Sequence, residues 1–262
     1  MIIKAKKSLG QNFLFDKQIL EIISNCAEIK DKDILEVGPG TGYLTNEILL
    51  KKPKNFFVVE KDKNLLELLK KKFEDKIIYI NDDILKISEK KISKNKLTVF
   101  GNLPYNISTE ILTKWIVNLN SVNWFDKLIL MFQKEVANRI IAKYNTSSYG
   151  RLSIISNWRL EIKKIIDIKP HSFKPSPKVD STLLVFKPKE NFFKFDNINS
   201  LENVTKIFFN QRRKKIKKPL NQLFNNVDEI VKKYNISLDL RPQNLNNETY
   251  YLITKEYENL RS

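Results

Sequence analysis

Short apolar runs alternate with amphipathic segments along the first half of the chain. Four apolar runs have the length and composition of buried strands, at residues 33–37, 56–59, 76–80 and 97–100. Apolar residues recur at helical spacing in three segments, at residues 19–27, 43–50 and 64–73. Strands that alternate with helices in this way predict a mostly parallel sheet covered by helices, which is the α/β class.

The pattern changes in the second half of the chain. Three further apolar runs predict strands, at residues 128–133, 152–156 and 182–186. From about Pro188 the sequence is rich in Asn and Lys and shows only helical periodicity. We therefore expect an α/β domain over residues 1–187 and a small all-helical domain over residues 188–262.

The composition limits both the class of protein and its chemistry. With 262 residues, 42% of them hydrophobic, the chain can bury a full core. It has no apolar run near the length of a membrane span, and its first residues lack a signal-peptide core, so we expect a cytoplasmic protein. One cysteine, Cys26, and one histidine, His171, cannot build a disulfide, a Cys/His zinc site or a Ser-His-Asp centre. We therefore expect chemistry that needs no metal.

The charge is strongly unbalanced, since 47 Lys and Arg face 30 Asp and Glu, for a formal net charge of +17. A bias in genome base composition raises lysine content without any nucleic-acid partner, but the shortage of acidic residues favours a polyanionic partner. A small basic cluster lies near the N-terminus, at Lys4, Lys6 and Lys7. The densest basic run lies in the helical domain, at Arg212, Arg213, Lys214, Lys215, Lys217 and Lys218. Such a run is often only a solvated surface; here we expect it to contact RNA phosphates.

Glycines follow the first predicted strand in the pattern Glu-x-Gly-x-Gly-x-Gly, over residues 36–42. Glycines between a buried strand and a helix let a nucleotide approach the backbone, here at Gly38 and Gly40. The spacing differs from the Gly-x-Gly-x-x-Gly of dinucleotide sites and favours S-adenosylmethionine over NAD. The second strand ends in Glu60, where a carboxylate accepts hydrogen bonds from ribose hydroxyls.

Polar residues also follow the third and fourth strands. Asp82 and Asp83 form a carboxylate pair, of which one is expected to meet the adenine amine of the cofactor and the other to cap the next segment. The fourth strand is followed by Gly101 and then by Asn102, Leu103, Pro104 and Tyr105. Because the carboxyl ends of parallel strands meet at one edge of a sheet, we expect these groups to share one crevice.

The tetrapeptide from Asn102 to Tyr105 fits a planar base that carries an amine. The Asn102 side-chain oxygen and the Leu103 carbonyl, held by Pro104, offer two acceptors to the amine, and Tyr105 offers a stacking face. The alternative is a turn that merely closes a strand. Phe173 lies in a proline-rich loop, over residues 168–181, and is expected either in the core or, as we favour, as a second stacking face for the base.

Six motifs resemble, in order along the chain, those of the small-subunit ribosomal RNA adenine N6,N6-dimethyltransferases. They are GQNFL at 10–14, EVGPGTG at 36–42, GNLPYNIS at 101–108, QKEV at 133–136, YGRLS at 149–153 and PSPKVDS at 175–181. The resemblance extends into the helical domain through QRRKK at 211–215 and LRP at 240–242. It implies a class I, Rossmann-like methyltransferase that dimethylates two adjacent adenosines near the 3′ end of small-subunit rRNA, within a pre-assembled subunit.

Carried over by motif, the resemblance also implies roles for individual residues. Cofactor contacts are implied for Asn12, Leu14, Gly38, Glu60, Asp82 and Asn102. The target adenine is implied to lie among Asn102, Leu103, Tyr105 and Phe173. Asp83 stands where the family often has a small residue. The related large-subunit adenine methyltransferases of macrolide resistance and a non-catalytic assembly or transcription factor are the alternatives, and we expect a monomer.

Overall fold

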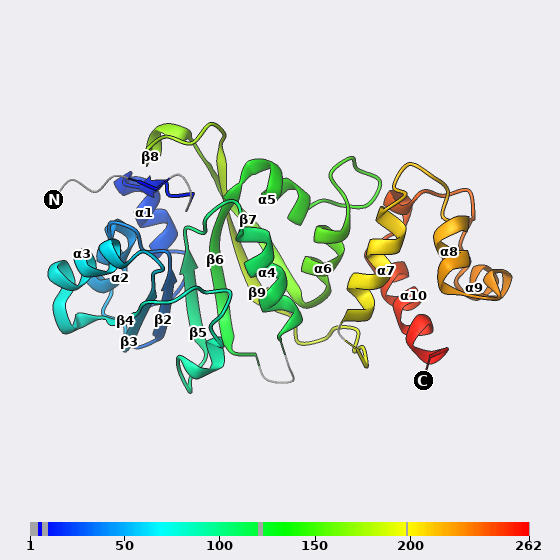
Figure 1. The fold of residues 1–262 in the computed structure, drawn as a ribbon, viewed down its shortest axis with the longest axis horizontal. Coiled ribbons are helices and arrows are strands. Elements are labelled where there is room, and N and C mark those ends of the chain that lie inside the picture. The colour runs from blue at the N-terminus through cyan, green and yellow to red at the C-terminus, as the bar shows by residue number, and fades with distance from the viewer. Residues whose placement is uncertain (1–4, 7–9, 120–122, 198, 262) are drawn as a thin grey trace. The chain divides into compact units, whose positions relative to one another are not determined.

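A computed structural model describes residues 5–6, 10–119, 123–197 and 199–261. The chain forms two compact units (Figure 1). The first comprises Met1–Ala137 and Glu161–Pro188, and the second comprises Asn138–Leu160 and Lys189–Ser262. The second unit resumes at Lys189, beside the boundary predicted at residue 188, and it also contains residues 138–160, which the sequence assigned to the α/β domain.

The first unit is built on a seven-stranded sheet of order β4-β3-β2-β5-β6-β9-β7. Its strands are β2 (Asp33–Val37), β3 (Asn55–Val59), β4 (Ile78–Ile80), β5 (Leu97–Gly101), β6 (Phe125–Gln133), β7 (Leu160–Ile168) and β9 (Ser181–Pro188). Neighbours from β4 through to β6 pair in parallel, whereas β9 runs antiparallel to β6. The carboxyl ends of β2, β3, β4 and β5 therefore share one edge, as predicted from the alternating pattern.

Helices connect these strands and bury their apolar faces. They are α1 (Lys17–Ser24), α2 (Tyr43–Leu50), α3 (Lys63–Phe73), α4 (Ser108–Val117) and α5 (Lys134–Ile140), with short 3-10 turns at Glu74–Lys76, Glu89–Lys91 and Pro170–Ser172. The carboxylate of Asp16 caps α1 by accepting the backbone N–H groups of Gln18 and Ile19. Ile34, Val58 and Phe100 of the central strands are at most 2% exposed, because both faces of a parallel sheet are covered.

A two-stranded ribbon joins the N-terminal segment to the proline-rich loop. Strand β1 (Phe13–Leu14) pairs antiparallel with β8 (Phe173–Lys174), so that Leu14 lies opposite Phe173. The Oγ of Ser172 donates a hydrogen bond of 2.9 Å to the Asp16 carboxylate and strengthens this junction. The two segments, far apart in sequence, thus form one layer over the first unit.

The second unit is helical, as predicted for the C-terminal part. It contains α6 (Arg151–Arg159), α7 (Asn199–Phe209), α8 (Lys217–Leu223), α9 (Val227–Tyr234) and α10 (Asn247–Asn259), with a 3-10 turn at Pro242–Asn244. Tyr250 is completely buried and contacts the rings of Phe208 and Phe209. Tyr251 donates a hydrogen bond of 2.9 Å to the carbonyl of Ile154, which ties α6 into this unit.

Two predicted strands need correction. Residues 152–156 form part of α6, where four of these five residues are buried, and in so short a segment periodicity cannot distinguish a buried helix from a strand. The predicted strand over residues 76–80 is shortened to Ile78–Ile80, since Glu74–Lys76 forms a 3-10 turn.

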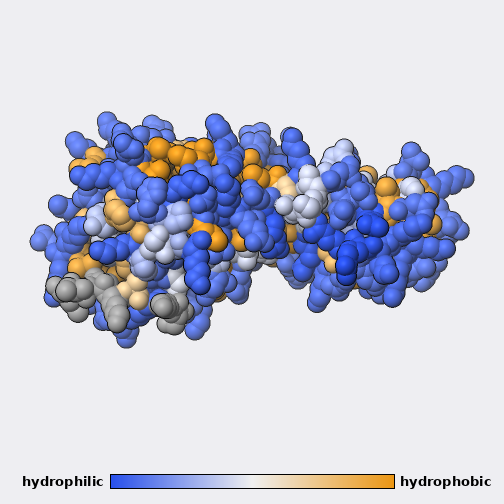
Figure 2. Space-filling view, turned by 90° about the horizontal axis from the view of Figure 1, so that it is seen from above, coloured by the Kyte–Doolittle hydropathy of each residue, from blue (hydrophilic) through white to orange (hydrophobic). Residues whose placement is uncertain are grey.

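In the described residues, no helix is long and apolar enough to cross a membrane. Figure 2 shows a largely hydrophilic face with separate small hydrophobic patches.

Candidate active site

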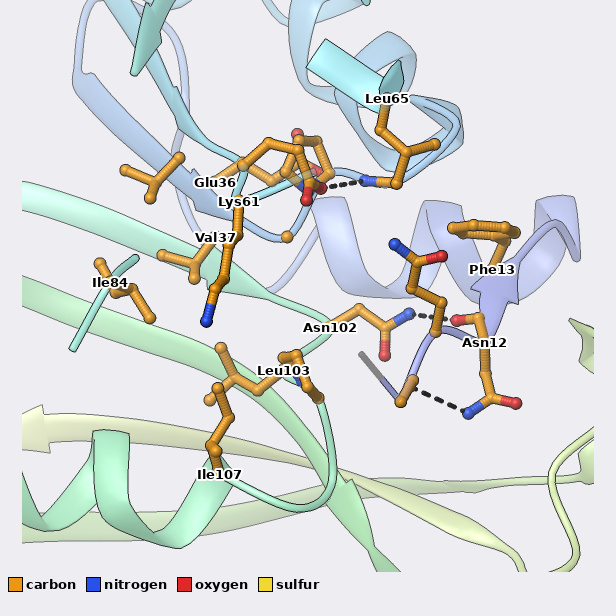
Figure 3. Close-up of a pocket in the computed structure, with 18 of the residues that line it drawn as sticks. Asn12, Phe13, Glu36, Val37, Lys61, Leu65, Ile84, Asn102, Leu103 and Ile107 are labelled. Carbon is orange, nitrogen blue, oxygen red and sulfur yellow. Dashed lines mark hydrogen bonds between the residues drawn. The ribbon is translucent and has the colours of Figure 1, made fainter. Parts of the chain in front are cut away.

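A cavity of about 300 Å³ lies at the carboxyl ends of β2, β3 and β5 (Figure 3). Its lining includes every residue that the sequence assigned to the cofactor, namely Asn12, Leu14, Gly38, Gly40, Glu60, Asp82 and Asn102. It also includes Leu103, Pro104 and Tyr105, the tetrapeptide expected to hold the base. The structure therefore brings the predicted cofactor and base residues into one crevice, as the parallel sheet requires.

The turn after β2 is shaped by its glycines. Gly38 and Gly40 have φ angles of 69° and 58°, in the left-handed region that side chains rarely adopt. A Cβ atom on Gly40 would lie only 2.7 Å from the Cδ1 atom of Phe13 in the N-terminal segment. The glycines thus keep open a cradle in which a ligand can approach the backbone.

Glu60 lies beside this cradle and is 7% exposed. Its Oε1 accepts the backbone N–H of Asp62 at 2.9 Å, and its Oε2 accepts the N–H of Gly40 at 3.4 Å. Burial raises the pKa of this carboxyl above its ordinary value. A fixed carboxylate in the cavity wall suits the two hydroxyls of a ribose.

Glu36 is a functional candidate that the sequence analysis did not single out. It lies in the strand that leads into the glycine turn, is 2% exposed and lines the cavity, and the Oγ1 of Thr45 donates a hydrogen bond of 2.7 Å to its carboxyl group. Burial, with a smaller contribution from the charge of Glu60, raises the pKa of Glu36 to about 8. The signal in the sequence was an acidic residue between the apolar residues Leu35 and Val37 of a buried strand.

The two carboxylates after β4, Asp82 and Asp83, differ in their contacts and exposure. The Oδ2 of Asp83 forms an ion pair of 2.8 Å with Lys61, and its Oδ1 accepts the N–H of Leu85 at 3.0 Å. The hydrogen bond from Lys61 lowers the pKa of Asp83. Asp83 therefore holds both the loop and the side chain of Lys61, which extends past Val37 in Figure 3. Both carboxylates belong to the cavity lining, and Asp82 is the more exposed of the two.

Apolar side chains complete this part of the cavity. Val37, Leu65 and Ile84 contribute to its lining, which also includes the carboxylates of Glu60 and Asp82. Apolar side chains together with a few acceptors are what an adenine ring and its ribose need. The residues present therefore fit the adenosyl part of S-adenosylmethionine.

Asn102 connects the cavity to the N-terminal segment. Its Nδ2 donates a hydrogen bond of 2.8 Å to the main-chain carbonyl of Asn12 (Figure 3). A carbonyl can only accept, so this bond fixes which end of the side-chain amide faces Asn12. The Oδ1 of Asn102 is then left to accept a hydrogen bond from a ligand.

The remainder of the tetrapeptide is held by its surroundings. Leu103 is 1% exposed, and the N–H of Ile107 donates to the Pro104 carbonyl at 3.1 Å. The hydroxyls of Tyr105 and Ser181 share a hydrogen bond of 2.6 Å, and burial raises the pKa of Tyr105. The Tyr105 hydroxyl therefore stays protonated at neutral pH, and the ring has a fixed orientation.

Phe173 does not lie where the favoured prediction placed it. It is 2% exposed, belongs to the hydrophobic core and is absent from the cavity lining. Its pairing with Leu14 in the ribbon accounts for this burial. The structure corresponds to the alternative in which Phe173 is a core residue, and Tyr105 is the aromatic residue of the predicted pair that lines the cavity.

The N-terminal segment is anchored at Asp62. The Nζ of Lys6 lies 2.8 Å from one carboxylate oxygen of Asp62, and the Gln11 side chain donates to the same carboxylate at 3.2 Å. These contacts lower the pKa of Asp62. Of the N-terminal residues considered above, Lys4 and Lys7 lie outside the described residues.

In the basic run of the second unit, some side chains are bonded to other residues and some are exposed. Arg212 donates to the Gln243 side chain at 3.2 Å and to the carbonyl of Ser147, and Lys215 pairs with Asp239 at 2.6 Å. The exposed remainder consists of Arg213, Lys214, Lys217 and Lys218, for which the described residues provide no ion pair. These four side chains are the ones available to a polyanion.

Comparison with known proteins identifies the family. Residues 2–259 match the family of ribosomal RNA adenine dimethylases. The chain is 61% identical, over the full length of both proteins, to ribosomal RNA small subunit methyltransferase A of Pelagibacter ubique (strain HTCC1062). It is 42% identical to the protein of that name from Ehrlichia ruminantium (strain Gardel), with 93% of this chain and 94% of the relative covered.

Solved structures show the same fold. A dimethyladenosine transferase from Plasmodium falciparum matches with a TM-score of 0.77 and 26% identity, over 95% of this chain and 98% of that one. The 23S rRNA methyltransferase ErmE matches with a TM-score of 0.70 at 22% identity, over 95% and 100% of the two chains, which shows a shared fold. By sequence and by fold, therefore, this chain belongs to the ribosomal RNA adenine dimethylase family.

Proposed function

We propose that this enzyme transfers two methyl groups from S-adenosylmethionine to N6 of each of two adjacent adenosines near the 3′ end of small-subunit rRNA. The observation that carries the proposal is the orientation of Asn102 at the edge of the adenosyl cavity, where its Nδ2 donates to Asn12 and its Oδ1 forms no hydrogen bond with the residues that the structure describes. The names of the Pelagibacter and Ehrlichia relatives support the small subunit as the source of the RNA.

The proposed reaction depends on positioning. S-adenosylmethionine supplies a sulfonium methyl group that is already activated toward a nucleophile. The amine of adenine is a poor nucleophile, because its lone pair is delocalised into the ring. Acceptors at the Asn102 Oδ1 and the Leu103 carbonyl hold the two amine hydrogens and draw the nitrogen out of conjugation. Alignment of reacting atoms by such groups supplies about 7 to 11 kcal/mol of the barrier in favourable cases.

The base must leave its stack to reach these acceptors. The Tyr105 ring, fixed by the bond to Ser181, offers a stacking face that is worth about 1 to 3 kcal/mol and offsets part of the cost of extrusion. After alkylation the nitrogen is acidic, and its proton passes to the Asn102 oxygen, the Leu103 carbonyl or water. This route needs no general base, which agrees with a chain that has one histidine and one cysteine.

We also propose where the enzyme works and how it holds the RNA. The helical second unit binds RNA phosphates through Arg213, Lys214, Lys217 and Lys218, while the first unit carries the chemistry. The substrate is a pre-assembled small subunit, and the enzyme acts as a cytoplasmic monomer. The strongly basic composition and the exposed basic run support this part of the proposal.

The test is transfer of labelled methyl from S-adenosylmethionine to undermethylated small subunits and, separately, to naked large-subunit rRNA, with the modified nucleoside mapped. We expect N6,N6-dimethyladenosine only in the small-subunit particle. Label in the large-subunit RNA would instead assign the enzyme to the macrolide-resistance type. No label, despite tight binding of both ligands, would indicate an assembly or transcription factor.

A further inference from the structure

A second hollow lies at the edge of the sheet opposite the active-site cavity. It is bounded by the last part of α2, the loop before β3 and the end of α3, and thus lies at the amino-terminal ends of β3 and β4. Four of the ten residues that line it are lysines, namely Lys52, Lys54, Lys72 and Lys76, and we call it the lysine groove. It shares no lining residue with the active-site cavity.

The lysine groove has four cationic side chains and no acidic one among the residues that line it. No carboxylate lines it, and in the described parts of the chain none of its four lysines forms an ion pair. Other lysines of the first unit, such as Lys61 and Lys114, are paired with carboxylates. Four like charges around one hollow repel one another, and a bound polyanion removes that repulsion.

The floor of the groove is apolar. Leu50 is 69% exposed at its edge, and Phe73 and Pro53 also line it. The Nζ of Lys72 lies 4.9 Å from the centre of the Phe73 ring and 5.5 Å from that of Tyr43. Apolar surface edged by cations matches a nucleic-acid strand, which has sugars and bases between its phosphates.

We propose that the lysine groove binds the phosphodiester backbone of a single-stranded RNA segment, at a position on the substrate remote from the target adenosines. The proposal rests on RNA being the substrate, as proposed above. Lys52, Lys54 and Lys76 lie near the amino-terminal ends of β3 and β4, whereas the cavity lies at the carboxyl ends of β2, β3 and β5, so we expect a short stem-loop seated at the cavity not to reach these three lysines. Lys72 differs, because its Nζ lies 5.5 Å from the ring of Tyr43, which lines the cavity. The RNA of a whole small subunit is long enough to contact both the cavity and the lysine groove.

The test compares two triple variants in the full-length protein. Lys52→Gln, Lys54→Gln and Lys76→Gln remove three charges, while Lys52→Arg, Lys54→Arg and Lys76→Arg keep them. Lys72 is left unchanged, because its neighbour Tyr43 lines the active-site cavity. Binding to small-subunit particles and to a short stem-loop that carries the target adenosines is measured against salt concentration.

We expect the Gln variant to lose up to about a hundredfold in affinity for the particle at 0.1 M salt, with a salt slope reduced by about 2. Its affinity for the stem-loop, its affinity for S-adenosylmethionine and its melting temperature should match those of the unchanged protein. The Arg variant should bind the particle normally. These are binding measurements, so they stand even if neither RNA is methylated, a result that would refute only the proposed function.

Three results would overturn the inference. The first is an unchanged particle affinity and salt slope in the Gln variant. The second is an equal loss for the particle and the stem-loop, which would reflect net charge alone. The third is an equal loss in the Gln and Arg variants, which would show that charge at these positions is not what binds the RNA.

Discussion

The side chain of Asn102 holds the main-chain carbonyl of Asn12, 90 residues earlier in the chain, through a hydrogen bond of 2.8 Å. The bond joins the loop that receives the base to the N-terminal segment that covers the cofactor cavity. It also directs the Oδ1 of Asn102 away from Asn12. One interaction thus links the two halves of the site and sets the orientation of the acceptor.

Replacing Asn102 by Asp tests this orientation. The carboxylate has nearly the same shape but cannot donate to the Asn12 carbonyl, so we expect it to turn away. Misplacement of a reacting group by about 1 Å costs about a hundredfold in rate, and we expect the rate constant of methyl transfer to fall by that order. The measurement is single-turnover methyl transfer, with RNA affinity determined in parallel.

Asn102→Ala serves as the companion variant, since it removes both the acceptor and the bond to Asn12. It should abolish turnover and largely spare RNA binding. A parallel loss of RNA binding in both variants would count against the assigned role, because it would place Asn102 in substrate affinity instead of in the reaction.

The bond between Tyr105 and Ser181 predicts coupled effects. Tyr105→Phe and Ser181→Ala each remove one partner, and each should lower kcat/KM by about three- to tenfold, the equivalent of one hydrogen bond. The double variant should lose about as much as either single one, since the same bond is removed. Tyr105→Ala should lose more, because the stacking face goes too. Additive losses in the double variant would show that the two hydroxyls act separately.

The alternating pattern of strands and helices was enough to predict the sheet, and therefore the meeting of Gly38, Glu60 and Asn102 at one edge. What it could not supply was long-range pairing. The burial of Phe173 follows from its pairing with Leu14, about 160 positions away, and nothing local in the loop distinguishes a core residue from a stacking face.

The same limitation applies to partners and to deeply buried segments. Arg212 is bonded to Gln243, whereas Arg213 is exposed and forms no ion pair with the described residues. This difference depends on contacts between distant segments, and the basic run itself is uniform in sequence. Residues 152–156 have the apolar content of a strand, and four of these five residues are buried in α6. Glu36 stands in the same motif as Gly38 and Gly40, and the sequence alone does not show that its carboxyl group is buried.

Gly40→Ala should weaken cofactor binding. The added methyl group meets Phe13 at 2.7 Å, and the φ of 58° disfavours any side chain, so the turn or the N-terminal segment must move. We expect at least a tenfold rise in the dissociation constant for S-adenosylmethionine, measured by calorimetry, with RNA affinity unchanged. Gly150→Ala is the control, because its nearest side-chain atom is 3.7 Å from the new methyl group and its φ is extended. Normal cofactor affinity in Gly40→Ala would contradict the conclusion that the glycine turn leaves room for the cofactor.

The exposed and the tied basic residues should behave differently. Arg213→Gln, Lys214→Gln, Lys217→Gln and Lys218→Gln together should weaken RNA binding and flatten its dependence on salt, because they remove free phosphate contacts. Arg212→Gln should instead lower the melting temperature, since it breaks the bonds to Gln243 and Ser147. An unchanged salt slope in the fourfold variant would exclude this run as an RNA contact.

Glu36 should make the cofactor-free protein less stable as the pH rises. Its pKa is 4.5 when exposed and about 8 in the folded protein, so between these values the unfolded chain releases a proton that the folded chain keeps. The unfolded state then binds fewer protons, and the contribution of Glu36 to the free energy of unfolding falls by about 1.4 kcal/mol per pH unit. Below pH 4.5 and above pH 8 this contribution is level.

Glu36→Gln isolates that contribution, because an amide is neutral at every pH and can still accept the Thr45 hydroxyl. The free energy of unfolding, measured by denaturant titration of both proteins from pH 5 to pH 9, gives the difference directly. The advantage of the variant should grow as the pH rises to about 8 and then stay constant. A difference that is independent of pH would mean that Glu36 ionises in the folded protein as readily as in the unfolded chain, and that its burial does not hold it neutral.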